Sequence, residues 1–430
     1  MLDLKLIRAE PDLVRDAARK KHIPCDVDRI LEVDAQWREL GQSVDDMRAK
    51  QKAASKAFGQ QMAKATPEER EQLQAQQRGA KEELKALEER AAALKQELDG
   101  LLLLVPNLPA AEVPEGADDS ENVELRKVGA PREFGFEMRD HVALAEAQGW
   151  LDVIAGARIA GSRNYILKGD LSLLEGALMR FALDHMVGKG FVPLTVPTLV
   201  RSDVMVGTGY FPGGEDQAYR CDERDDLCLV GTAEVPVTAL HAGEILPLSD
   251  LPKRYVALST CYRREAGAAG RDTRGLYRVH QFQKVEQVIV DVSDEANSRE
   301  HHDSILANSE EVLQALDLPY RVVNVCGGDL GQPQVQKFDI ETWMPSREGY
   351  GETHSASRFH DFQSRRLNLR YRDGEGKVRH CHTLNNTVAA STRMLIAVLE
   401  NHQTESGQVA VPEVLRPYLG GRELLGQPLA

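Results

Sequence analysis

An apolar repeat that runs through residues 30 to 105 constrains the fold of this chain more than any other feature of its sequence. Apolar or small side chains recur every three or four positions on both sides of a single break at Thr66-Pro67. That spacing puts them on one face of a helix and is typical of a coiled-coil seam. The seam consists of Ile30, Val33, Trp37, Leu40, Val44, Met47, Gln51, Ala54 and Phe58 and, after the break, of Leu73, Ala80, Leu84, Leu87, Ala91, Leu94, Leu98, Leu101 and Val105.

The break itself carries the signals of a helix start. Thr66 is a good N-cap, Pro67 suits the first helical position, and Glu69 completes a T-x-x-E capping box. The sequence therefore predicts an antiparallel helical hairpin over about 27–104, in which two long helices are joined by a tight turn. A coiled coil that only dimerises the protein is the alternative that the periodicity leaves open.

The tip of this hairpin is basic, although the whole chain has a formal net charge of -14. Five lysines or arginines and no acidic residue lie between Arg48 and Lys64. Arg48, Lys52 and Lys56 follow at spacings of four, so they share one helix face. This face is a candidate contact for a phosphate backbone, and a solvated surface is the alternative interpretation.

Length and composition bound the rest of the chain. Its 430 residues predict two domains, and 42% hydrophobic with 28% charged residues is typical of a soluble globular protein. We expect no membrane helix and no secretory signal, because no apolar run is long enough. Six cysteines spread over this length predict the reducing cytoplasm. His380, Cys381 and His382 lack the spacing of a zinc site, so we interpret them as structural.

The predicted domains are residues 1–105, a proline- and acid-rich linker at 106–125, and a second domain at 126–430. Helical patterns in the second domain cover 171–191, 298–318 and 391–403, and strand patterns cover 255–265, 279–292, 320–326 and 365–372. Two strands joined by one loop pair antiparallel, which predicts an α+β fold on a mostly antiparallel sheet flanked by helices.

The predicted strands 255–265 and 279–292 enclose the stretch "CYRREAGAAGRDTRGLYRVHQFQKVEQ", which holds five arginines around a glycine-rich loop. Guanidinium groups bind phosphate oxygens bidentately, and the Phe282 ring offers a flat face to a purine. On the return strand His280, Phe282, Lys284 and Glu286 share a face. No GxxxxGK[ST] or GxGxxG loop occurs, so a different nucleotide site is the hypothesis. A surface hairpin whose arginines, such as Arg271 and Arg274, pair with acids is the alternative.

These two strands and their loop resemble motif 2 of the class II aminoacyl-tRNA synthetases, and the chain is most similar to the seryl-tRNA synthetase family. The likeness extends over nearly the whole length, and no HIGH or KMSKS pair of class I is present. It rests on the hairpin and on "MLDLKLIR", "VPNLPAAEVPEG", "GTGYFP", "GTAEVPV", "DFQSRRLNLRYR" and "TRMLIAVLENHQ".

The resemblance implies a class II catalytic sheet, a homodimer with Pro197 at its interface, and no membrane. It implies ATP with Mg²⁺, and two-step transfer of serine to the 3′ end of tRNA(Ser). The helical hairpin, with Arg48, Lys52 and Lys56, is expected to hold the long variable arm of this tRNA, whose acceptor end reaches the catalytic domain.

Site residues follow from the same resemblance. Arg263, Glu265 and Arg393 are expected to be catalytic, with Arg263 on the α-phosphate and Phe282 under the adenine. Glu352 and Ser355 are expected to hold the metal. The expected ATP site is Arg263, Arg264, Glu265, Arg274, Val279, Phe282, Glu352, Thr353, His354, Ser355 and Arg393. The expected serine site is Thr232, Ala233, Glu234, Arg263, Glu286, Asn385 and Thr387.

Two segments depart from the family pattern. Motif 3 reads "NNTVAASTR" where "NGSGLAVGR" is usual, so Asn386 and Val388 replace glycines. We expect Val388 to fill space near the amino acid, and His354 and Arg358 to lie near the metal. Two alternatives are a serine-activating paralogue that loads another acceptor and a non-catalytic RNA-binding scaffold. Such paralogues tend to lack the long hairpin, and a scaffold is expected to lose Arg263, Glu286 or Arg393, all of which are present.

Overall fold

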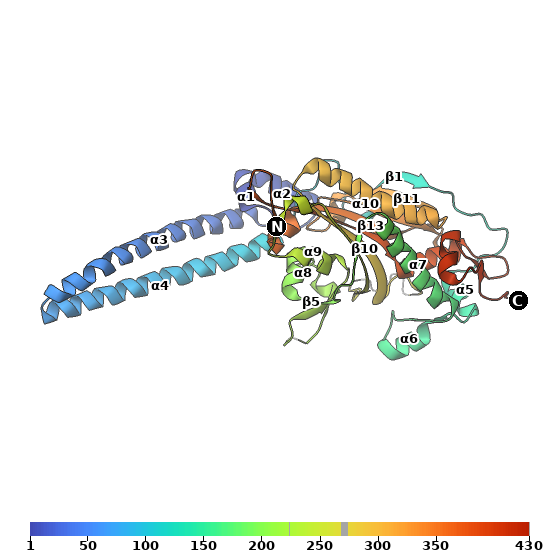
Figure 1. Ribbon diagram of the computed structural model, residues 1–430, viewed down its shortest axis with the longest axis horizontal. Coiled ribbons are helices and arrows are strands. Elements are labelled where there is room, and N and C mark those ends of the chain that lie inside the picture. Colours follow the sequence, from blue (N-terminus) through green and yellow to red (C-terminus); the bar gives the residue numbers. More distant parts are fainter. Residues whose placement is uncertain (223, 268–273, 430) are drawn as a thin grey trace. The chain divides into compact units, whose positions relative to one another are not determined.

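The computed structural model describes residues 1–222, 224–267 and 274–429 (Figure 1), so Arg271 lies outside the described residues. The chain divides into two compact units. The helical unit comprises Leu2–Arg19 and Ile23–Pro106. The second unit, which we name the catalytic unit after its expected function, comprises Met1, Lys20–His22 and Asn107–Ala430. Within the described ranges, no helix has the length and apolarity that crossing a membrane requires.

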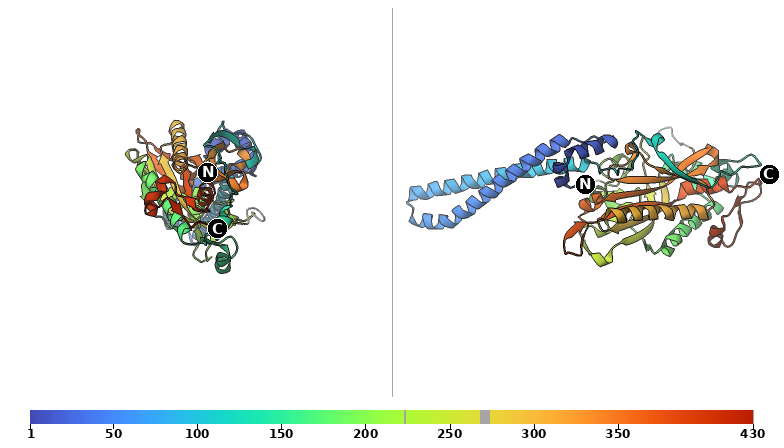
Figure 2. Two further views of the ribbon diagram at one scale, coloured as in Figure 1. Left: turned by 90° about the vertical axis from the view of Figure 1, so that its right-hand side faces the viewer. Right: turned by 90° about the horizontal axis from the view of Figure 1, so that it is seen from above.

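The helical unit confirms the predicted hairpin. Its elements are α1 (Leu4–Ala9), α2 (Pro11–Lys20), α3 (Val27–Lys64) and α4 (Pro67–Leu104), and α3 and α4 lie side by side (Figures 1 and 2). Between them Thr66 accepts a hydrogen bond from the Glu69 backbone, while the Glu69 carboxylate accepts one of 2.7 Å from the Thr66 N–H. The predicted capping box is therefore the feature that starts α4.

The seam between α3 and α4 is mostly apolar, and polar side chains also link the two helices. Ile30, Val33, Val44 and Leu98 are buried, and the side-chain amide of Gln51 donates to the carbonyl of Ala80. Burial of such side chains contributes about 1.5–3 kcal/mol each. The exposed ion pairs across the hairpin contribute much less, because water screens them.

The catalytic unit is built on one eight-stranded sheet, and only its β4–β9 pair is parallel, which confirms the predicted α+β class. In spatial order the strands are β1 (Val123–Val128), β11 (Tyr320–Asn324), β12 (Gln336–Met344), β13 (Gly349–His360), β16 (His382–Ala390), β10 (Gln281–Asp291), β9 (Lys253–Tyr262) and β4 (Val192–Leu194).

The three longest helices of this unit contribute to the main core beside the sheet: α7 (Asp170–Gly188), α10 (Glu295–Ala315) and α12 (Ser391–Asn401). The shorter helices are α5 (His141–Ala147), α6 (Val153–Ala160), α8 (Ser202–Thr208), α9 (Glu234–Thr238) and α11 (Phe362–Leu367). The short strands are β2 (Leu151–Asp152), β3 (Ile166–Leu167), β5 (Leu199–Arg201), β6 (Tyr219–Arg220), β7 (Leu227–Leu229), β8 (Ile245–Pro247), β14 (Arg370–Arg372), β15 (Val378–His380), β17 (Val409–Ala410) and β18 (Leu424–Leu425).

One predicted strand is half wrong. Residues 365–367 close the helix α11, which ends at Asn368 in the left-handed conformation (φ 52°). Only β14 is extended, and it pairs with β15 and β8 outside the main sheet. The buried Phe362 and Leu367 show that the local pattern was that of a short amphipathic helix.

The segment predicted as a linker is packed into the catalytic unit at both of its ends. The side-chain amide of Asn107 donates to the carbonyls of Pro333 (2.9 Å) and Phe359 (2.7 Å). At the other end Val123 already begins β1, which pairs with β11.

Candidate active site

Two adjoining cavities in the catalytic unit share the side chains of Arg263, Lys284 and Ser355. The first cavity is lined by Arg263, Glu265, Tyr277, Val279, Phe282, Lys284, Glu352, Thr353, His354, Ser355, Thr387, Ala390, Thr392 and Arg393. The second cavity is lined by Thr208, Gly209, Tyr210, Thr232, Glu234, Val235, Arg263, Lys284, Glu286, Gly331, Pro333, Gln334, Ser355, Ser357, Phe359 and Asn385.

Arg263 lies at the wall that the two cavities share. It directly follows β9, and its backbone N–H donates to the carbonyl of His280 at 2.9 Å. Its Nε donates to the carbonyl of Gly231 at 3.3 Å, and its guanidinium carbon lies 5.4 Å from the centre of the Phe282 ring. Among the described residues Arg263 makes no ion pair with an acidic side chain, although its charge acts on Glu352, which lines the same cavity. Its charge is therefore available to an anionic ligand.

Arg393, at the start of α12, is already paired. Its guanidinium stacks on the Tyr277 ring at 4.6 Å and donates to Glu352, to the carbonyl at 2.7 Å and to the carboxylate at 3.2 Å. Burial alone raises the pKa of Glu352, but the charges of Arg393, Lys337 and Arg263 lower it well below the usual value. Glu352 is therefore ionised at neutral pH.

The second cavity holds two carboxylates with different partners. Glu234 accepts a hydrogen bond of 2.8 Å from Gln363, and burial, followed by the negative charge of Glu286, raises its pKa to about 7. Glu286 is paired with the ammonium of Lys284 at 2.7 Å and accepts a bond of 3.2 Å from the hydroxyl of Thr387. One carboxyl thus titrates near neutrality beside one that is held by a cation.

Asn385 adds an open donor to this cavity. Its side-chain nitrogen is buried and makes no hydrogen bond of normal geometry within the described parts of the chain, although it lies close enough to the Glu234 carboxyl to lower the pKa of that group. A buried amide without a partner is costly, which favours a ligand at this position.

Most of the expected site residues line these cavities. In the first are Arg263, Glu265, Val279, Phe282, Glu352, Thr353, His354, Ser355, Thr387 and Arg393, and in the second are Thr232, Glu234, Glu286 and Asn385. The lining sets do not include Arg264, which is exposed, Arg274, which pairs with Asp140 at 3.3 Å, or Ala233, which is buried in a small apolar cluster.

Two of the lining side chains are engaged inside the protein. The Thr353 hydroxyl lies 2.7 Å from that of Thr342, and the His354 ring bonds to the Thr353 hydroxyl (2.8 Å) and the Val388 carbonyl (3.1 Å). Burial lowers the pKa of His354 to about 4, so its imidazole is neutral at pH 7.

The expectations for Val388 and Arg358 are wrong, because both side chains project from the opposite face of the sheet. Val388 is fully buried in the main core, and the neighbouring Asn386 donates to Ser309 of α10 at 2.9 Å. Arg358 is fully buried and pairs with Glu112 (3.0 Å) and Glu295 (2.8 Å). Side chains alternate along a strand, and neither Val388 nor Arg358 is among the residues that line the two cavities.

The "HCH" stretch has structural contacts. His382 lies 2.7 Å from the hydroxyl of Ser298, and its ring stacks on that of His360 with 4.8 Å between centres. Cys381 is buried. Across residues 1–222, 224–267 and 274–429, no group of three or more His, Cys, Asp or Glu side chains is arranged to hold a metal.

The sequence placed Lys284 on the same face of its strand as Phe282 and Glu286 but assigned it no role. Two further contributors were missed. Tyr277, which supports Arg393, and Gln363, which holds Glu234, lie outside any strand and carry no local signal.

At the tip of the helical unit, Arg48 is not a free cation. It donates to Glu88 of α4 at 2.9 Å. Lys52 and Lys56 are exposed, and no ion pair is found for them in the described part of the chain.

The sheet and the paired cavities define a class II aminoacyl-tRNA synthetase, and residues 219–402 match the tRNA synthetase class II core domain (G, H, P, S and T). Residues 1–109 match the seryl-tRNA synthetase N-terminal domain. A serine–tRNA ligase of Deinococcus radiodurans is 48% identical over 429 residues, which cover 100% of both chains. The chain belongs to the seryl-tRNA synthetase family, whose activity is the activation of serine and the charging of tRNA.

Other relatives and solved structures are also similar to this chain over nearly its whole length. A serine–tRNA ligase of Thermomicrobium roseum is 46% identical over 99% of this chain and 95% of its own. The structure of seryl-tRNA synthetase from Pyrococcus horikoshii complexed with ATP has a TM-score of 0.91 at 38% identity and covers 100% of both chains. The cytoplasmic serine–tRNA ligase of Naegleria fowleri in complex with AMP has a TM-score of 0.86 at 32% identity, with 99% of each chain covered.

Proposed function

We propose that this chain forms seryl-adenylate in the two cavities, with ATP in the first and serine in the second, and then transfers the seryl group to the 3′ end of tRNA(Ser). The observation that carries the proposal is the position of Arg263. Its guanidinium lines both cavities and has no acidic partner among the described residues. The α-phosphate has to lie between nucleotide and amino acid. Two cations line both cavities, and Arg263 is the one that can bind this phosphate, because Lys284 is paired with Glu286 at 2.7 Å.

The first reaction needs positioning and charge neutralisation and no covalent enzyme intermediate. A carboxylate oxygen of serine forms a bond to the α-phosphorus, the bond from this phosphorus to the bridging oxygen breaks, and pyrophosphate leaves. Arg263 stabilises the charge on the α-phosphate. Phe282 supports the adenine and Arg393 binds the γ-phosphate. In the second reaction a 3′-terminal hydroxyl attacks the seryl carbonyl and AMP leaves.

Glu352 and Ser355 fit Mg²⁺, which prefers oxygen ligands. The carboxylate of Glu352 is ionised, its side chain is 46% exposed, and both residues line the first cavity. The ion supplies neutralisation of the phosphate charge when bound. Glu352 and Ser355 would hold the ion, and a Glu352 carboxylate bound to it would leave the guanidinium of Arg393 to the phosphates.

The second cavity accounts for recognition of serine. Glu234 holds the ammonium, and Glu286 binds the hydroxyl together with Thr387, which lines the first cavity and donates to Glu286. Lys284 holds the Glu286 carboxyl in place. Alanine leaves these groups without a partner, and threonine has to fit one more methyl group into the same space.

Serine-dependent exchange of pyrophosphate into ATP tests this function. We expect serine to support exchange with a kcat/KM at least about 10²-fold above that of alanine or threonine, since alanine loses the contacts of the hydroxyl and threonine has to fit a further methyl group. Equal rates with the three amino acids would contradict the proposed serine pocket, and no exchange with serine would contradict the function.

The affinity for serine is expected to rise with pH, because Glu234 must be ionised to hold an ammonium. Its pKa of about 7 makes it mostly neutral near pH 6 and mostly ionised near pH 8. The KM for serine should therefore fall about tenfold between these values. In the Glu234→Gln variant the KM for serine should be high at both pH values and should no longer depend on pH. The KM for ATP serves as the control. The same pH profile in wild type and variant would remove Glu234 from this role.

We further propose a homodimer in the cytoplasm. Pro197 is exposed, and Val192 (52%) and Leu199 (45%) expose apolar side chains on the strands to either side of it, a surface that a second copy of the chain can cover. All six cysteines are free, which suits a reducing compartment.

The exposed Lys52 and Lys56 support contact of the hairpin with the backbone of the variable arm of tRNA(Ser).

A further inference from the structure

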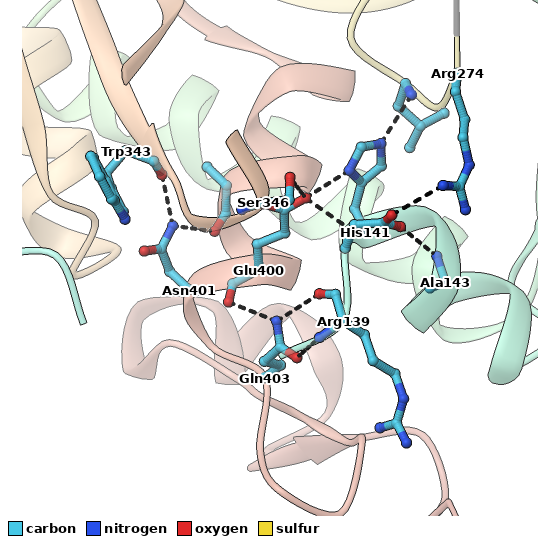
Figure 3. A network of polar contacts seen from close by, with 12 residues as sticks. Arg139, His141, Ala143, Arg274, Trp343, Ser346, Glu400, Asn401 and Gln403 are labelled. Atoms are coloured by element: carbon cyan, nitrogen blue, oxygen red, sulfur yellow. Dashed lines mark hydrogen bonds and ion pairs between the residues drawn. The ribbon is translucent and has the colours of Figure 1, made fainter. Parts of the chain in front are cut away.

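A buried relay holds the segment that returns from the glycine-rich loop to β10 (Figure 3). His141 begins α5, and its Nδ1 lies 2.8 Å from the carboxylate of Glu400, near the end of α12. Its other ring nitrogen, Nε2, accepts a hydrogen bond of 3.3 Å from the backbone N–H of Leu276. Because a backbone N–H can only donate, Nε2 carries no proton and Nδ1–H donates to Glu400.

Glu400 is built to hold that ring. Its carboxylate is fully buried and accepts four hydrogen bonds. Two come from His141, through the backbone N–H (3.0 Å) and Nδ1, and two come from Ser346, through the backbone N–H (3.0 Å) and the hydroxyl (2.8 Å). Four donors compensate for the burial of a charge and fix the direction of the imidazole.

The residues that follow Leu276 shape the first cavity. The Tyr277 ring lies under the guanidinium of Arg393 at 4.6 Å. Arg278 pairs with the carboxylate of Glu265 at 3.3 Å. Arg393 and Glu265 both line the cavity, so a displacement of Leu276 would disturb both contacts.

The close passage over His141 is a second, independent observation. Gly275 has a φ of +84°, and a Cβ atom at this position would lie 2.2 Å from Nε2 of His141. Only glycine fits this approach without a shift of the chain. Arg274, one residue earlier, pairs with Asp140, whose carboxylate also caps α5 through the Ala143 N–H at 2.7 Å.

We infer that His141, oriented by Glu400, is a positioning residue for ATP. Its unprotonated Nε2 fixes Leu276, and through it Tyr277 and Arg393, at the nucleotide. The inference rests on the proposed ATP site in the first cavity. None of the hydrogen bonds of His141 described above involves Glu234, Glu286 or Asn385, which line the second cavity. The relay therefore acts on ATP and not on serine.

A matched pair of substitutions separates the two ring nitrogens. His141→Asn places an amide N–H near the position of Nδ1 and keeps the bond to Glu400, but it loses the acceptor for Leu276. His141→Gln places a carbonyl oxygen near the position of Nε2 and keeps that acceptor. In pyrophosphate exchange we expect His141→Asn to raise the KM for ATP about tenfold and to leave the KM for serine within about twofold, while His141→Gln stays within about threefold of the wild type for both.

If the ring of His141 served only to neutralise Glu400, the order of the KM values for ATP would be reversed, and His141→Gln would be the worse variant. That ranking, equal values for both variants, or a loss shared between the two substrates would overturn the inference. Gly275→Ala, which pushes the chain off the imidazole, should also raise the KM for ATP. His402→Asn is the control, because it removes a ring that bonds the Leu316 carbonyl, and it should leave both KM values unchanged.

Calorimetric titration of the same variants with Mg²⁺-ATP gives the ranking without the reaction, and their melting temperatures verify folding. If the wild type bound ATP but showed no serine-dependent exchange, the proposed function would fail, and the relay would still be judged by the order of the ATP affinities.

Discussion

Replacement of Arg263 by alanine is expected to lower the kcat of serine-dependent pyrophosphate exchange about 10³-fold. Arg263 lines both cavities, and the described residues offer its guanidinium no acidic partner, so it can follow the charge on the α-phosphate. The nearby cation of Lys284 cannot replace it, because that ammonium is held by Glu286 at 2.7 Å. The measurement is the rate at which labelled pyrophosphate enters ATP.

Arg254→Ala is the matched control, because Arg254 is an exposed arginine on the same strand, β9. It should exchange within about twofold of the wild type, as surface substitutions usually do. An Arg263→Ala variant that melts like the wild type and keeps a comparable exchange rate would contradict the role of Arg263.

Shortening of the helical hairpin is expected to separate the two half-reactions. Excision of residues 46–86, closed by a short glycine-serine turn, joins positions that lie close together, since Arg48 contacts Glu88 and Gln51 contacts Ala80. Charging of tRNA(Ser) should fall at least about 10³-fold in kcat/KM, because the proposed phosphate contacts of the hairpin are lost. Pyrophosphate exchange should stay within about threefold of the wild type, because both cavities belong to the catalytic unit.

A charge reversal tests the same surface without a deletion. Lys52→Glu with Lys56→Glu should raise the KM for tRNA and weaken its salt dependence. Lys85→Glu is the control, because Lys85 is an exposed lysine (77% of its side chain) on α4 with a local partner, Glu89. Equal loss of exchange and charging in the shortened protein would contradict an arm that serves tRNA alone.

The helical hairpin could be predicted closely because its signals are local. The apolar spacing, the capping box at Thr66 and the proline after it all depend on residues within a few turns of each other, and the observed helices, Val27–Lys64 and Pro67–Leu104, cover the predicted span. The prediction of a strand over 365–372 is wrong in its first half, because a six-residue helix is too short for its apolar spacing to be distinguished from that of a strand.

In the active site, too, local features could be predicted from the sequence and long-range contacts could not. Phe282, Lys284 and Glu286 share a face because of alternation along one strand, which can be read directly. The faces of Arg358 and Val388 depend on the register of β13 against β16 and of β16 against β10, and both pairings contain a bulge. His141, Leu276 and Glu400 meet across separations of 135 and 259 residues, and such contacts leave no local pattern.

A crystal structure with a non-reactive sulfamoyl analogue of seryl-adenylate tests the central claim most directly. The account predicts adenine on Phe282 in the first cavity, the sulfamoyl group on the guanidinium of Arg263, and the serine moiety in the second cavity with its ammonium at Glu234. An analogue bound elsewhere, or bound here while Arg263 contacts only the Gly231 carbonyl, would contradict it.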